Sequence, residues 1–99
     1  AATQLVDSFR VVVSGDDVPA ANPAPDIFLA VADLLQAPAS RCVVVEDSPT
    51  GIQAAHNAGM KCVAVATSFS PAQLTAADLV VAGLTELSVA LLQRLAMKR

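Results

Sequence analysis

Tryptophan and tyrosine are absent from this 99-residue sequence, and only six residues are lysine or arginine. The formal net charge is −3, and the few cations form no cluster. Proteins that bind nucleic acids use basic patches to contact phosphates and aromatic rings to stack on bases. The composition therefore gives no support to a nucleic-acid partner.

Long apolar runs are also absent. A membrane-spanning helix needs roughly 18 or more consecutive apolar residues, and no run approaches that length, so we expect no membrane span. The chain starts AATQL, with neither a methionine nor the basic and apolar regions of a secretory signal. From this start we expect a cut fragment or a processed chain.

Cysteine is scarce as well. The two cysteines, Cys42 and Cys62, each open a valine-rich segment. A disulfide framework needs more cysteines and a less hydrophobic chain, whereas a free cysteine packs as a small apolar residue. We therefore expect buried, reduced thiols and an intracellular, reducing compartment, either the cytoplasm or the matrix or stroma of an organelle.

Apolar residues are abundant instead, at 55% of the sequence against 15% charged residues. This is more apolar than an average soluble domain, and disordered segments are poor in such residues. The length suits one small folded domain. The apolar excess must be buried within this chain or against another protein.

Valine-rich segments alternate with helix-like segments along the chain. We predict strands at residues 10–15, 42–46, 61–66 and 78–83. The predicted helices begin at Pro25, Pro49 and Pro71, and a last one carries Leu87, Ala90, Leu91 and Leu95 on one face. This alternation predicts an α/β fold with a Rossmann-like parallel sheet and flanking helices. Strands without polar alternation fit a sheet that is buried on both sides.

Two of these helices carry distinct local signals. Ser48 is a good N-cap with proline at the next position, and Gly59 is well placed to end that helix. The helix that begins at Pro25 has Ile27, Phe28, Val31, Leu34 and Leu35 on one face.

Two acidic residues, Glu46 and Asp47, follow the second predicted strand directly. Ligands of parallel sheets bind beyond the carboxyl ends of the strands, and neighbouring carboxylates repel unless a cation joins them. Mg²⁺ accepts one or two carboxylates together with waters and a substrate phosphate, and the start of the next helix suits an anion. The pattern favours a metal-assisted phosphate site. The alternative is a solvated loop in which Asp47 helps to cap the helix.

Several other polar residues have either a structural role or a role in ligand binding. Asp16 and Asp17 either cap a loop or line the mouth of a cleft, and Thr67 and Ser68 form either a polar turn or a ligand contact. We expect His56 on the surface of its helix, since no partner at the spacing of a metal site or a catalytic base accompanies it.

Three segments in order, NPAPDIFLAVADLL, CVVVEDSPTGIQAAHNAGM and KCVAVATS, resemble the haloacid dehalogenase-like (HAD) hydrolase superfamily. The similarity is greatest to the branch that holds β-phosphoglucomutase and small phosphatases, and it covers residues 10 to about 83. It implies that residues 1–99 are the C-terminal portion of a HAD-like hydrolase core domain, a partial core without its first two strands and its cap.

The resemblance also implies an activity and a set of roles. Family members transfer phosphoryl groups of phosphorylated small molecules, as phosphatases or phosphomutases, through a phosphoaspartate and with Mg²⁺. The resemblance makes Asp47 a metal ligand and Glu46 a ligand or a partner behind the ligand. Ser48 supports the loop and is a weaker candidate for substrate binding. Asn22 stands where the family has a lysine that neutralises charge on the phosphate.

The sequence departs from the family in two ways. The nucleophile motif Asp-x-Asp-Gly-Thr and the family's Ser/Thr motif do not occur in it. Asn22 can donate a hydrogen bond to phosphate but brings no positive charge, and losing one preorganised stabiliser typically costs about 3–4 kcal/mol. We therefore expect the fragment alone to be inactive.

The family's sheet has its first two strands between those that correspond to residues 10–15 and 42–46. Without them we expect exposed strand edges and apolar helix faces, and a protein partner or the missing N-terminal half that completes the sheet. Three hypotheses stay open: a piece of a Mg²⁺-dependent HAD phosphatase or phosphomutase, a non-catalytic HAD-like subunit of a larger assembly, or an unrelated Rossmann-type nucleotide binder. The last is weak because no G-x-G-x-x-G follows a strand.

Overall fold

The computed structural model describes residues 9–13, 24–86, 88, 91–92 and 94–95. Its strands and helices follow the predicted order, and they are β1 (Arg10–Val13), α2 (Asp26–Leu34), β2 (Cys42–Glu46), α3 (Pro49–Asn57), β3 (Lys61–Val65) and β4 (Leu79–Val81). Three short 3₁₀ turns span Ala39–Arg41, Pro71–Leu74 and Leu84–Glu86. Residues 91–92 and 94–95 are helical, in agreement with the last predicted helix, whereas its Leu87 and Ala90 lie outside the described residues.

The four strands form one parallel sheet in the order β1-β2-β3-β4. All five residues of β2 are buried, as are the last four of β3. A strand buried on both faces has no reason to alternate apolar and polar residues, which explains the unbroken valine runs. The predicted α/β fold with a parallel sheet is confirmed.

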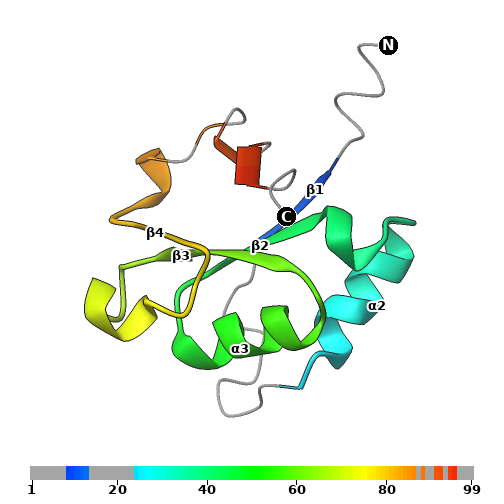
Figure 1. Ribbon diagram of the computed structural model, residues 1–99, viewed down its shortest axis with the longest axis horizontal. Coiled ribbons are helices and arrows are strands. Elements are labelled where there is room, and N and C mark those ends of the chain that lie inside the picture. Colours follow the sequence, from blue (N-terminus) through cyan, green and yellow to red (C-terminus); the bar gives the residue numbers. More distant parts are fainter. Residues whose placement is uncertain (1–8, 14–23, 87, 89–90, 93, 96–99) are drawn as a thin grey trace.

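Each face of the sheet carries its own apolar core. α2 and α3 pack on one face, and Leu92 and Leu95 pack on the other (Figure 1). The first core includes Phe28, Ala32, Val44, Ile52 and Cys62. The second includes Val43, Val45, Val63, Leu92 and Leu95. Burying one such aliphatic or aromatic side chain contributes about 1.5–3 kcal/mol, so these layers hold the strands in register.

The expected gap between the first two strands of this chain is not found. β1 pairs directly with β2, from Arg10 opposite Cys42 to Val13 opposite Val45. An unpaired strand leaves its backbone groups without partners, and pairing with β2 satisfies one edge of β1. The other edge of β1 is the end of the sheet, where the side chain of Val13 is 69% exposed.

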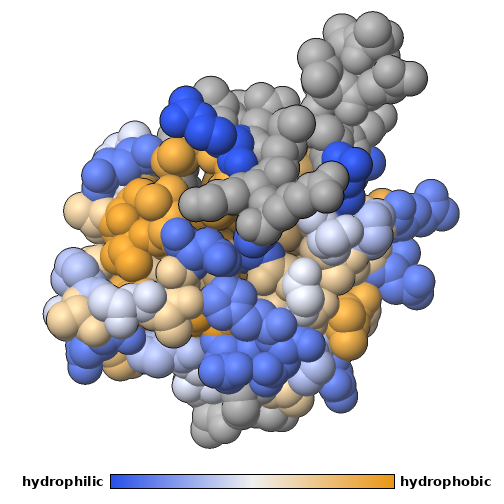
Figure 2. Space-filling view, viewed as in Figure 1, coloured by the Kyte–Doolittle hydropathy of each residue, from blue (hydrophilic) through white to orange (hydrophobic). Residues whose placement is uncertain are grey.

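α2 buries less of its apolar surface than its sequence pattern predicted. Phe28 and Ala32 contact the core, whereas Ile27, Leu34 and Leu35 are exposed. The helix touches the sheet along a narrow stripe, and the remaining apolar residues have no layer to pack against. Figure 2 shows apolar atoms open to solvent over α2, as expected for a sheet whose helical cover is incomplete.

Candidate active site

The carboxyl ends of the four parallel strands lie along one edge of the sheet, where ligands of such sheets bind. A hollow of about 130 Å³ opens at this edge. Residues that end or follow the strands line it, namely Val13, Val45, Glu46, Asp47, Val65, Thr67 and Leu84. The acidic pair and the hydroxyl of Thr67 thus share a small cavity with three valines and a leucine.

Asp47 is the outward member of the acidic pair. It lies just beyond β2 and is half-buried. Its Oδ2 accepts a hydrogen bond of 3.4 Å from the hydroxyl of Ser68, which follows β3. Asp47 lines the hollow, and the loop that follows β3 meets it at this carboxylate. A carboxylate in this position is accessible to a ligand.

Glu46 is turned the other way. Successive residues of a strand point to opposite faces, and Glu46 shares the side of Val44, toward α3. It is only 4% exposed, and its Oε1 accepts hydrogen bonds from the backbone N–H of Asp47 at 3.0 Å and from the hydroxyl of Ser48 at 3.1 Å. Its Oε2 is buried without a hydrogen-bond partner among the described residues. The two acids that adjoin in sequence therefore occupy different surroundings.

The turn from β2 into α3 is built as the sequence predicted. Ser48 is the N-cap, and its Oγ accepts the N–H of Gly51 at 3.1 Å, with Pro49 at the first helical position. At the other end of α3, Gly59 has a φ of +80°, the left-handed conformation that glycine adopts without strain. Both helix boundaries were correctly placed from the sequence.

Gly51 is needed for a reason that the sequence alone did not show. A Cβ built at Gly51 would overlap the carboxyl carbon and Oε2 of Glu46. At Gly51 the helix therefore approaches the end of β2 closely, through one specific contact. The space that a side chain would fill at position 51 is occupied by the Glu46 carboxylate.

A second polar cluster lies at the opposite end of the strands, near their amino ends. His56 near the end of α3 lies 2.9 Å, from Nε2 to Oδ2, from Asp78, which precedes β4. The same Oδ2 accepts the backbone N–H of Cys62 at 2.8 Å. His56 is partly exposed, as predicted, but its partner Asp78 was missed. The two residues are 22 positions apart, and no local pattern connects them.

Burial and hydrogen bonding act on Asp78 in opposite directions. Burial alone would raise the pKa of its carboxyl, but the hydrogen bonds from His56 and the Cys62 N–H, with the charges of His56 and Lys61, lower it below 3.8. Asp78 is thus an ionised anchor for three elements of the fold, α3, β3 and β4, rather than a proton donor.

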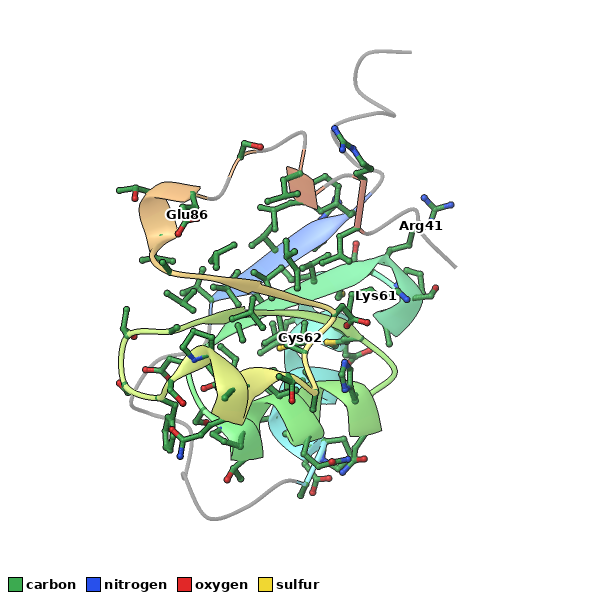
Figure 3. The ribbon with its side chains drawn as sticks, turned by 60° about the vertical axis from the view of Figure 1, so that its left-hand side comes forward. Arg41, Lys61, Cys62 and Glu86 are labelled. Atoms are coloured by element: carbon green, nitrogen blue, oxygen red, sulfur yellow. The ribbon has the colours of Figure 1, made fainter. Side chains whose placement is uncertain are left out.

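Both cysteines are free and buried. Burial, with smaller effects from the charges of Glu46 and Asp78, raises the pKa of Cys62 to about 12. Burial also raises the pKa of Cys42. Figure 3 shows Cys62 beneath the sheet on the side of α3, next to Lys61. Because the nucleophile is the thiolate and not the thiol, neither cysteine is suited to catalysis, in agreement with the prediction of buried thiols.

The described residues contain no group of three or more His, Cys, Asp and Glu side chains that could hold a metal ion. Mg²⁺ is commonly bound by one or two carboxylates, with waters and substrate phosphate as the other ligands. Asp47 fits this need, since it lines the hollow and is only half-buried. Glu46 fits it less well, since its Oε1 already accepts two hydrogen bonds inside the protein.

Three other candidates, Asp16, Asp17 and Asn22, lie outside the described residues. Of the remaining candidates, Thr67 lines the hollow and is exposed. Within the described part of the chain, no helix has the length and apolar character needed to cross a membrane.

The sequence matches known proteins along most of its length. Residues 1–65 match the profile of the family described as haloacid dehalogenase-like hydrolase. The chloroplastic 5-amino-6-(5-phospho-D-ribitylamino)uracil phosphatase of Arabidopsis thaliana is 44% identical over 88 residues, 89% of this chain and 24% of the relative. The chloroplastic protein SUPPRESSOR OF QUENCHING 1 of the same plant is 52% identical over 66 residues, 67% of this chain and 6% of that protein. The chain thus spans at most 24% of the length of these two relatives.

Solved structures agree with the sequence relatives. A HAD hydrolase of family IA, variant 3, from Entamoeba histolytica superposes with a TM-score of 0.73 and 26% identity, over 85% of this chain and 39% of that one. β-Phosphoglucomutase of Clostridium difficile superposes with a TM-score of 0.68 and 32% identity, over 76% of this chain and 32% of the enzyme. The predicted resemblance is confirmed, and the chain belongs to the haloacid dehalogenase-like hydrolase family.

Proposed function

We propose that this chain supplies the metal-binding strand end of a phosphoryl-transfer site, in a phosphatase or phosphomutase of the HAD family. The observation that carries the proposal is the position of Asp47, whose carboxylate lies at the carboxyl end of a central buried strand, on the rim of a hollow. Relatives named as phosphatases and a β-phosphoglucomutase support the class of reaction.

In this proposal Asp47 holds Mg²⁺, and the ion would neutralise charge on the phosphoryl group in transfer. Ser48 ends the turn with its hydroxyl bound to Glu46, so it steadies the loop rather than the substrate. Thr67 lines the hollow and Ser68 donates to Asp47 Oδ2, so both hydroxyls are candidates to donate to a phosphate oxygen.

The substrate class we propose is a phosphorylated small molecule. The hollow is small, which matches the size of a phosphoryl group and leaves most of a substrate to be contacted by other parts of the protein. The named relatives act on different phosphate esters, among them a phosphoribitylamino-uracil and validoxylamine A 7'-phosphate. The class, rather than one compound, is what these names support.

We also propose that residues 1–99 are the C-terminal portion of the HAD core domain and that other residues supply the nucleophile. Asp47 with Glu46 does not make a complete cation site among the described residues, and the chain spans only a fraction of its relatives. The location we propose is a reducing compartment, in the cytoplasm or an organelle. Two free buried thiols and two relatives named as chloroplastic support it.

One observation favours a second candidate, a non-catalytic HAD-like subunit. β1 and β2 pair directly in the structure. Because they are hydrogen-bonded neighbours, two more strands cannot lie between them. A second observation, from the sequence, is that Asn22 stands at the position of the family's lysine. In this alternative the acidic pair is a remnant of ancestry.

Asp47→Asn is the test of the catalytic proposal. The chain is combined with a segment from a relative that carries Asp-x-Asp-Gly-Thr, and Mg²⁺-dependent hydrolysis of p-nitrophenyl phosphate is measured. We expect the substitution to abolish the Mg²⁺-dependent rate, because it removes the outward carboxylate. Asp33→Asn removes the same charge from an exposed position of α2 and should leave the rate unchanged. No Mg²⁺-dependent hydrolysis by the unsubstituted assembly would favour the non-catalytic subunit.

A further inference from the structure

The Glu46 carboxylate lies in a closed space beneath the first turn of α3. Its exposed fraction is 4%, and its Oε1 accepts two hydrogen bonds, from the N–H of Asp47 and the hydroxyl of Ser48. A buried carboxylate is stable only when polar groups or positive charge surround it. The start of α3 supplies such a field, because the first peptide dipoles of a helix point their positive end at this site.

The hydrogen bonds of this carboxylate form a chain that determines where Asp47 points. The N–H of Gly51 donates to the Ser48 hydroxyl, which donates to Glu46 Oε1. The backbone N–H of Asp47 donates to the same oxygen. Holding the N–H of Asp47 toward the interior fixes the peptide plane at its Cα. Its side chain is thereby directed to Ser68.

Gly51 provides the space for this arrangement. A Cβ at position 51 would meet Glu46 Cδ, Oε2 and Cγ at distances that real Cβ atoms do not show. The overlap involves most of the Glu46 side chain rather than its tip, so a residue larger than glycine must displace it. The position of the Glu46 side chain therefore requires glycine at position 51.

The positive end of α3 is thus neutralised by a side chain of the protein itself. A substrate anion does not need to occupy that place. Glu46 is among the residues that line the hollow, but its carboxylate is held beneath α3 by the two hydrogen bonds of Oε1. The Oε2 atom faces Gly51 and has no hydrogen-bond partner among the described residues.

We infer that Glu46 is a positioning residue that works from inside the protein. It orients Asp47 through the Asp47 N–H and the Ser48 hydroxyl, it depends on glycine at position 51, and it is not a metal ligand. The inference rests on the proposed function only in taking Asp47 as the residue that holds the cation.

The first test measures binding of Mn²⁺, as a paramagnetic probe, to the full chain and its variants. Asp47→Asn should abolish binding. Glu46→Ala should weaken it about 10- to 100-fold, the usual effect of losing a partner behind a metal ligand. Glu46→Gln retains a carbonyl oxygen for both hydrogen bonds and should weaken binding by less than about 10-fold. If Glu46→Gln weakens binding as much as Asp47→Asn, Glu46 is itself a ligand and the inference is wrong.

Gly51→Ala provides an independent variant. It should weaken Mn²⁺ binding as Glu46→Ala does, because the new methyl group expels the Glu46 side chain. The double variant Glu46→Ala/Gly51→Ala should bind and melt no worse than Glu46→Ala alone, because the space is then vacant. Unchanged Mn²⁺ affinity in Gly51→Ala would overturn the inference.

A readout that needs no metal separates this inference from the proposed function. The amide proton of Asp47 should be downfield and slow to exchange in the unsubstituted chain and in Glu46→Gln, and upfield and fast to exchange in Glu46→Ala. If the unsubstituted chain binds no Mn²⁺, the proposed metal role fails while this comparison still decides the role of Glu46. An Asp47 amide that is unaffected by Glu46→Ala overturns the inference.

Discussion

At the scale of the residue, Glu46 and Asp47 carry the same functional group but differ in everything around it. Glu46 is buried and bound to backbone and hydroxyl donors, whereas Asp47 lies at the rim of the hollow. Alternation along the strand separates them, and the turn at Ser48 holds the separation. Chemical role here follows from direction and surroundings rather than from residue type.

The substitution Asn22→Lys tests whether a missing cation limits the reaction. In an assembly with Mg²⁺-dependent activity, we expect kcat to rise, by up to about 10²- to 10³-fold if the ammonium group acts as a preorganised stabiliser of the transition state. Steady-state hydrolysis of p-nitrophenyl phosphate measures the change. Ser40→Lys adds the same charge at an exposed position before β2, at the amino end of that strand, and should have no effect. An equal rise in both variants would indicate a general charge effect.

The substitution Asp78→Ala tests the anchor near the amino ends of the strands. Losing its bonds to His56 and the Cys62 N–H should lower the free energy of unfolding by about 1–3 kcal/mol at neutral pH. The pKa of Asp78 is lowered in the folded state, so its contribution is fully present above 3.8 and is lost as the pH falls through the lower native value.

Urea unfolding at pH 7 and at a pH below 3.8 measures both the loss of stability and its dependence on pH. The difference in stability between the unsubstituted chain and Asp78→Ala should shrink on acidification. Asp33→Ala removes an exposed carboxylate and should change stability little at either pH. A difference that stays constant from neutral to acid pH would show that the ionised form of Asp78 is not what stabilises the fold.

At the scale of the element, α3 depends on its two ends. Gly59 ends the helix at a φ of +80°, and a Cβ there would lie 3.7 Å from the Cβ of Ala39, an ordinary contact. Gly59→Ala should therefore destabilise through backbone conformation alone, by about 1–2 kcal/mol. Gly83→Ala is a matched control, because its added Cβ would meet nothing within 4 Å and its φ is not positive. Thermal unfolding of the two variants should show a lower Tm for Gly59→Ala only.

Also at this scale, the type and order of the strands and helices followed from local pattern. The valine runs, the Ser48 cap and the glycine at position 59 act within a few neighbouring residues, so they can be recognised in the sequence. The burial of α2 was less predictable. Its pattern showed that it has an apolar face, but how much of that face is covered depends on the layer against which it packs.

At the scale of the whole molecule, apolar surface remains open at one end of the sheet. The outer edge of β1 has no strand beside it among the described residues, and Val13 is 69% exposed. Leu34 on α2 is 82% exposed. Unpaired strand edges favour pairing with another chain, so we expect the isolated chain to self-associate or to require a partner.

Sedimentation velocity over a range of concentrations tests this expectation. Val13→Lys should reduce association, because a lysine on an edge strand opposes edge-to-edge pairing. Leu34→Lys places the same charge on α2 and shows how much of the association is due to that helix instead. A monomer of the unsubstituted chain that melts cooperatively at low concentration would contradict the expectation.

Local patterns in the amino-acid sequence were enough to predict the family, the α/β alternation, the buried strands and the position of the acidic pair at a strand end. These properties arise from periodicity, caps and motifs, which are local. Only the tertiary structure decided that Glu46 turns inward, that His56 meets Asp78 and that β1 lies beside β2. These are contacts between groups whose directions and distances are determined by how layers pack, and packing depends on the whole chain at once.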